Sequence, residues 1–133
     1  MLRSRRIRRL GCTALILGAT ATVLACGDES AGPTAAPGDL AVQLGSPNGP
    51  EGALLVEFDG PVSASNPAAG QLHEIRDGDV TRILVLLEAE GVIGFQLAVP
   101  DTNSPPEYRI IEVSGPDNSI RNDLAGYSLE FSS

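Results

Sequence analysis

The sequence predicts an all-β protein with one antiparallel β-sandwich of about seven strands. From residue 39 onward, apolar and polar residues alternate with a period of two, which is the period of a half-buried strand. Clusters of Gly, Pro, Asn and Asp interrupt this pattern at near-regular spacing, and no helical periodicity of useful length occurs. Many short strands separated by turn signals are typical of a sandwich.

Each expected strand is a short run with one apolar face. Leu40, Val42 and Leu44 share a face in the first run, and Leu54, Val56 and Phe58 share one in the second. The most apolar run, 80–87, predicts a central strand or one buried on both faces. The expected strands are 39–44, 53–58, 71–76, 80–87, 92–99, 108–113 and 127–131.

The segments between these runs have the composition of loops. Residues 100–107 contain three prolines, which exclude both a helix and a strand ladder. The sequence Asp77-Gly78-Asp79 is a preferred hairpin turn. The long polar connection 114–126 has room for one helical turn near 118–124. The remaining connections are 45–52, 59–70 and 88–91.

The N-terminus has the pattern of an export signal. Five arginines precede residues 10–26, LGCTALILGATATVLAC, an uncharged run that is short of the roughly 20 apolar residues needed to cross a bilayer. Its last four residues, Val23-Leu24-Ala25-Cys26, resemble the lipobox of bacterial lipoproteins. The resemblance implies cleavage before Cys26 and lipidation of its sulfur. Alternatives are a plain secretory signal and an uncleaved membrane helix.

The resemblance divides the chain into three parts. Residues 1–25 are the expected signal peptide, residues 26–38 a lipidated cysteine with a flexible tether, and residues 39–133 the sandwich. The lipid chains imply a membrane as one partner. In the enterobacterial pattern, aspartate after the cysteine favours the inner membrane, so Gly27 favours the outer membrane of the cell envelope.

A second resemblance concerns the middle of the sandwich. Residues 82–101, RILVLLEAEGVIGFQLAVPD, look like the late strands of cohesin-type domains, in which an apolar strand, a glycine-containing turn and a G-x-x-x-F-x-L/V strand follow one another. The resemblance implies an Ig-like or cohesin-like sandwich. It covers about a fifth of the part that follows the signal and assigns no binding partner.

Charge and cysteine content exclude several function classes. Residues 26–133 carry four arginines, no lysine and seventeen acids, which gives a net charge of −13. Such a domain repels nucleic acid and anionic head groups. Cys12 leaves with the signal and Cys26 becomes a thioether, so the sequence predicts no disulfide and no cysteine metal site.

No catalytic constellation is evident. His73 is the only histidine, and no G-x-S-x-G elbow presents a serine to it, so we expect His73 on the surface and assign no catalytic residue. One histidine is also too few for a zinc site. Tyr108 and Tyr127 are expected to be core rings with their hydroxyls at the rim.

The acidic residues of the turns suggest two further sites. Asp77, Asp79 and Asp101 are candidate calcium ligands, although the full calcium-loop pattern is absent and a plain hairpin turn is the favoured explanation of Asp77-Gly78-Asp79. If each of seven strands crosses the sandwich, alternate connections gather at the end away from the tether. That count predicts an acidic tip made of Glu51, Asp77, Asp79, Asp101 and Glu107.

These observations support two function classes. The first is a membrane-tethered, non-enzymatic module of the cell envelope that binds a protein or glycan, or serves a structural role. The second is a calcium- or other metal-dependent exported module, or a hydrolase-type enzyme, whose acids meet only in the folded state. Apart from lipid on Cys26 and a possible calcium ion, the sequence predicts no cofactor.

Overall fold

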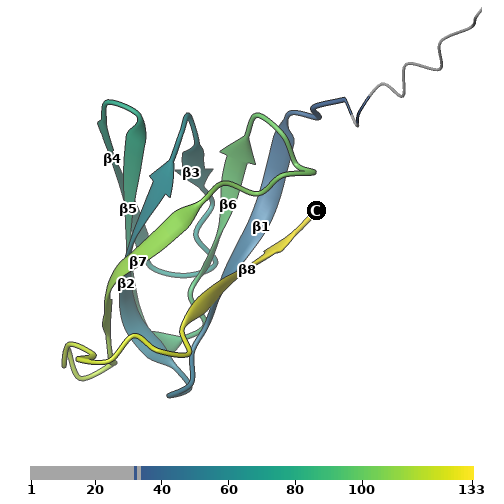
Figure 1. Ribbon diagram of the computed structural model, residues 1–133. Helices are drawn as coiled ribbons and strands as arrows, with labels where there is room; N and C mark the ends of the chain where they lie inside the picture. Colours follow the sequence, from purple (N-terminus) through teal and green to yellow (C-terminus); the bar gives the residue numbers. More distant parts are fainter. Residues whose placement is uncertain (1–31, 33) are drawn as a thin grey trace, which may run out of the picture. The chain divides into compact units, whose positions relative to one another are not determined.

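The computed structural model describes residue 32 and residues 34–133, and eight strands lie in this part of the chain (Figure 1). The expected signal peptide and Cys26 lie outside the described residues. The strands are β1 (Gly38–Gly45), β2 (Glu51–Asp59), β3 (Ser63–Ser65), β4 (Gln71–Asp77), β5 (Val80–Gly91), β6 (Gly94–Val99), β7 (Tyr108–Ser114) and β8 (Ser128–Ser132).

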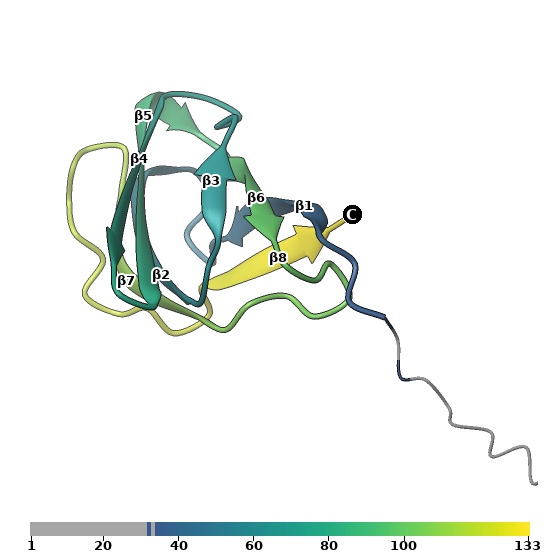
Figure 2. The same ribbon diagram turned by 90° about the horizontal axis from the view of Figure 1, so that it is seen from above.

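The strands form two antiparallel sheets of four, which confirms the predicted β-sandwich. Sheet A has the order β3-β6-β1-β8, and sheet B has the order β4-β5-β2-β7. Figure 2 shows the two layers separated, with sheet B on one side and sheet A on the other. Only the β4–β5 connection is a hairpin within one sheet, so every other connection crosses between the layers.

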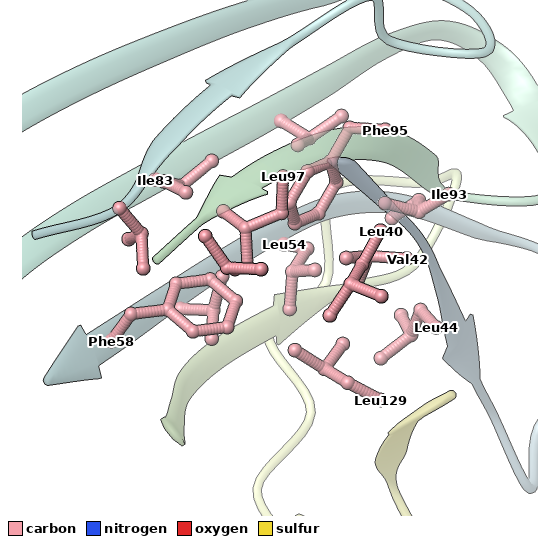
Figure 3. Close-up of a cluster of buried hydrophobic side chains, with 14 of the residues drawn as sticks. Leu40, Val42, Leu44, Leu54, Phe58, Ile83, Ile93, Phe95, Leu97 and Leu129 are labelled. Atoms are coloured by element: carbon pink, nitrogen blue, oxygen red, sulfur yellow. The ribbon is translucent and has the colours of Figure 1, made fainter. Parts of the chain in front are cut away.

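The core lies between the two sheets and is mostly aliphatic, with the phenylalanines Phe58 and Phe95 among its buried residues (Figure 3). The predicted apolar faces are the buried ones. Leu40, Val42 and Leu44 point inward from sheet A, and Leu54, Val56 and Phe58 point inward from sheet B. The rings of Phe58 and Phe95 meet edge to face with their centroids 6.4 Å apart.

The strand that sequence reasoning missed is β3. It is three residues long, and its sequence, Ser63-Ala64-Ser65, carries no apolar alternation. It forms because it pairs with the edge of β6, where Ser63 lies opposite Ala98 and Ser65 lies opposite Gln96. Tertiary pairing therefore produces a strand that local propensity does not indicate.

The most apolar run is central in its sheet, but it is buried on one face only. β5 lies between β4 and β2, and its Thr81, Ile83 and Val85 face the core. Leu84 and Leu86 face outward, and Leu86 is 39 % exposed. The expected turn at 88–91 is also wrong, because β5 continues to Gly91.

The connection after β7 contains no helical turn. Residues 115–121 instead fold back along the end of β7, where Ser114 forms an isolated antiparallel bridge with Ile120. The Arg121 N–H donates to the Val113 carbonyl at 2.8 Å. Sequence reasoning expected hydrogen bonds within 118–124, but the end of β7, which directly precedes this connection, supplies the partners.

The open edges of the sandwich are closed by side chains. On one side, the Glu74 carboxylate of β4 accepts hydrogen bonds from the Ala64 N–H at 2.8 Å and the Ser63 hydroxyl at 3.1 Å. On the other side, the Tyr108 hydroxyl accepts a 2.9 Å hydrogen bond from the Leu129 N–H of β8. Backbone groups satisfied in this way are not available for edge-to-edge aggregation.

Candidate functional site

The two ends of the sandwich differ in the loops they carry. We call the end beside Gly38 the tether end, because the chain enters the sandwich there. It holds residues 60–62, 78–79 and 100–107, which are linked by hydrogen bonds between the Thr102 N–H and the Ala36 carbonyl and between the Gly60 N–H and the Asp79 carbonyl. The opposite, distal end holds residues 46–50, 92–93 and 115–127 (Figure 1).

The predicted acidic tip does not exist, because its five residues lie at opposite ends. Glu51 begins β2 at the distal end. Asp101 lies at the tether end, where its carboxylate accepts a 3.1 Å hydrogen bond from the Ala36 N–H. The turn at Asp77 and Asp79 is also at the tether end, as is Glu107, whose carbonyl accepts a hydrogen bond from the Asp59 N–H.

The physical reason for this error is β3. The prediction treated 59–70 as one loop between two crossings of the sandwich. In the structure, β3 is a separate strand of sheet A that pairs with β6. The chain therefore runs once more from the tether end toward the distal end before β4 begins. Every later connection therefore lies at the end opposite to the one predicted.

The calcium candidates are engaged in other roles. Gly78 has φ +62° between the paired residues Asp77 and Val80, which confirms the hairpin turn. Asp101 accepts hydrogen bonds from Ala36 and Asn103, and these backbone donors hold the pKa of its carboxyl below the usual range. Among the described residues, no three acidic, histidine or cysteine side chains come together as a metal site.

We therefore expect millimolar calcium to leave the melting temperature of the purified protein unchanged. An ion that binds only the folded state must raise that temperature, because binding adds to the free energy of unfolding. Magnesium at the same ionic strength is the control for charge screening. A rise specific to calcium would contradict this expectation and revive the metal-dependent alternative.

His73 and Tyr127 lie where the sequence predicts, but Tyr108 is 37 % exposed and is not a core ring. His73 is an exposed residue of the edge strand β4, opposite Leu84. Tyr108 packs its ring against Phe58 and Phe131, and its hydroxyl reaches the rim at Leu129. Tyr127 is half-buried and directs its hydroxyl to Glu51.

The distal end contains a buried carboxylate with a full set of donors. Glu51 is 1 % exposed. Its Oε1 accepts hydrogen bonds from the Tyr127 hydroxyl at 2.5 Å and the Ser46 hydroxyl at 2.9 Å, and Asn48 in turn donates to the Tyr127 hydroxyl at 2.7 Å. Its Oε2 accepts from Arg121 Nε at 3.0 Å and Nη2 at 2.9 Å. We call Ser46, Asn48, Glu51, Arg121 and Tyr127 the distal cluster.

These donors keep Glu51 ionised. Burial by itself raises the pKa of the carboxyl, because it removes water from the charged form. The hydrogen bonds from Tyr127, Arg121 and Ser46 together outweigh that effect, so the pKa lies below its usual value. The cluster therefore joins residues 46–51 to residues 121–127 through a carboxylate that is charged at neutral pH.

A shallow cleft opens beside the distal cluster. It has a volume of about 350 Å³, and Glu51 forms part of its wall. Val92, which is 59 % exposed, stands at its mouth, and the β1 residues Gln43 and Leu44 line another side. Because loops on a rigid scaffold are the usual binding elements, this cleft is the first candidate for a ligand at the distal end.

The outer face of sheet B carries a second charged group. Glu57 is 9 % exposed and lies between Arg82 and Arg109, which extend from the neighbouring strands. Arg82 Nε donates to Glu57 Oε2 at 2.8 Å, and Arg109 Nη2 donates to Oε1. Hydrogen bonds from Arg82 and then Arg109 lower the pKa of Glu57. Apolar side chains continue along the same face.

Sequence reasoning singled out Glu51 but missed its partners. It placed the glutamate in an exposed acidic tip and gave Arg121 no role, since 70 residues separate the two. The available signal was compositional: Arg121 is the only cation in the connection 114–126 of an acidic domain. Such a cation must meet some carboxylate, but only the fold shows which one.

No described helix is long and apolar enough to span a membrane. No protein-family model, curated protein or solved structure matches this chain.

Proposed function

We propose that this chain is a lipid-anchored protein of the bacterial cell envelope whose β-sandwich is a non-catalytic binding module. The observation that carries the proposal is the combination of a lipobox-like sequence ending at Cys26 with a sandwich that begins only twelve residues later, at Gly38. A lipid on Cys26 would hold the tether end toward the membrane. The cleft and the distal cluster lie at the other end.

The chemistry of the distal cluster supports binding rather than catalysis. A general acid or base must exchange a proton with substrate and works best with a pKa near the operating pH. Glu51 has the opposite properties, since four hydrogen bonds occupy its carboxylate and its pKa is lowered. Its evident role is to fix the distal loops beside the cleft.

We expect Cys26→Ser to abolish lipid attachment. Cells fed an alkyne-bearing palmitate should label the wild-type protein, and the label should vanish in the variant because the sulfur that carries the diacylglyceryl group is gone. The variant should also remain an uncleaved precursor, which migrates as a larger species than the mature wild-type protein on a denaturing gel. Mass spectrometry of the mature N-terminus should find the modified Cys26 in the wild type.

Cys12→Ser is the matched control, because Cys12 lies inside the proposed signal peptide and leaves with it. Its labelling and cleavage should equal those of the wild type. Retention of label by Cys26→Ser, or a mature N-terminus at any other residue, would remove the anchor from the proposal.

A further inference from the structure

The outer face of sheet B carries apolar side chains at its centre that are partly exposed. The strand registers place Leu55 beside Leu84, and Ala53 beside Leu86, at the centre of this face. On the edge strand, Ile75 is 64 % exposed. The outer face of sheet A differs, since Gln43, Gln96 and Ser132 stand there around small residues. Large exposed apolar surfaces on small soluble domains mark sites of protein contact.

Charged and polar side chains flank this apolar centre in a defined order. One row across the four strands reads Glu112, Leu55, Leu84, His73, from β7 to β4. The next row reads Arg109, Glu57, Arg82, Ile75 in the same direction. Rotating the face about a line along the strands sets each β2 residue of a row against the β5 residue of the same row, and each β7 residue against the β4 residue.

We propose that the outer faces of sheet B from two copies of this chain pack together about a two-fold axis parallel to the strands. In this arrangement Leu55 faces the partner's Leu84, and Ala53 faces the partner's Leu86. Glu57 faces the partner's Arg82, Glu112 faces the partner's His73, and Arg109 faces the partner's Ile75. Two sheets packed face to face keep their strands within about 30° of each other, so the residues of these pairs remain opposite one another across the interface.

The direction of the axis follows from the proposed anchor, and this inference rests on that proposed function. An axis along the strands keeps both Gly38 residues at the same end of the dimer, so the two lipids can enter one membrane. An axis across the strands would place the two tether ends on opposite sides. A second copy is therefore an occupant that both the charge order and the anchor geometry accommodate.

The size of the face sets the strength of the contact. Four strands about 4.8 Å apart and seven residues of about 3.3 Å each give a flat face on the order of 400 Å² per copy. That is below the roughly 800 Å² per partner of a standard stable interface. We therefore expect weak dimers in dilute solution, and efficient pairing where the anchor confines both copies to one membrane.

Cross-linking of the full-length chain in membranes tests the dimer. Leu84 lies next to the proposed axis, so its two copies approach each other. A short bis-maleimide should link Leu84→Cys into a dimer at least ten-fold more efficiently than Ala98→Cys. Ala98 is the matched control, because it is an exposed strand residue on the outer face of sheet A. Equal yields, or an adduct with a different protein at Leu84→Cys, would overturn the proposal.

A second variant and a second readout separate this inference from the anchor. Leu84→Asp places a charge at the centre of the face and should raise the dimer dissociation constant at least ten-fold in sedimentation of the detergent-solubilised full chain, whereas Ala98→Asp should not. Palmitate labelling of the same samples reports the anchor. Labelled protein without cross-links would overturn the dimer alone, and cross-linked protein without label would overturn the anchor alone.

Discussion

Phe95→Ala should lower the free energy of unfolding by about 3–5 kcal/mol, as large-to-small changes of buried aromatic residues do. Phe95 is 4 % exposed, lies opposite Val42 in the β1–β6 pair and meets the ring of Phe58 edge to face (Figure 3). Its removal leaves a cavity between the sheets and removes an aromatic contact worth about 0.5–1.5 kcal/mol by itself.

This decrease is a large part of the total free energy of unfolding. Domains of this size have a total stability of about 5–15 kcal/mol, so the variant should melt on the order of 20 °C lower. Gln96→Ala is the matched control, because Gln96 is the next residue of β6 and points out of the sandwich; its effect should stay within about 0.5 kcal/mol. Equal denaturation midpoints for Phe95→Ala and the wild type would mean that the two faces of β6 are assigned in reverse.

The same alternation that identifies Phe95 explains how much of the fold the sequence predicts. A strand with one buried face shows its period of two directly, so β1, β2 and β6 and their core residues could be predicted. β3 has no apolar face, and its existence depends on the free edge of β6. The reason that residues 63–65 form a strand therefore lies in the partner strand β6 and not in their own sequence.

One missed strand was enough to misplace a site. Leu40 or Phe58 can be assigned to the core from neighbours two residues away, so a local error does not spread. Which end a loop occupies depends on the number of crossings before it, so the omission of β3 misplaced Asp77 and Asp101 together. The pairing of Glu51 with Arg121 is also non-local, because it joins the start of β2 to the connection before β8.

Arg121→Leu should destabilise the protein strongly at neutral pH. Glu51 is 1 % exposed, and in this variant it keeps only the Tyr127 and Ser46 donors. A buried carboxylate that loses its cation costs about 3–5 kcal/mol. Arg109→Leu is the matched control, because Glu57 retains Arg82 and the Arg109 side chain is 73 % exposed. In chemical denaturation, we expect the free energy of unfolding of Arg109→Leu to remain close to that of the wild type.

The pH dependence of stability should reverse between the two proteins. In the wild type the folded pKa of Glu51 lies below the unfolded value near 4.5. The unfolded state therefore binds more protons, and the contribution of Glu51, fully present above about pH 5, is lost as the pH falls through the folded pKa. In Arg121→Leu, burial, the largest influence, still raises the pKa and only the Tyr127 and Ser46 hydrogen bonds oppose it, so we expect a folded pKa above the unfolded one.

Folding of that variant then takes up a proton, and its unfolding free energy should rise as the pH falls from 7 toward 5, while that of the wild type does not. Urea denaturation at a series of pH values measures both slopes. The double variant Glu51→Leu/Arg121→Leu removes the carboxylate as well, so it should be more stable at pH 7 than Arg121→Leu alone and should lose the reversed slope. Parallel pH profiles for the wild type and Arg121→Leu would show that Arg121 does not hold the charge of Glu51.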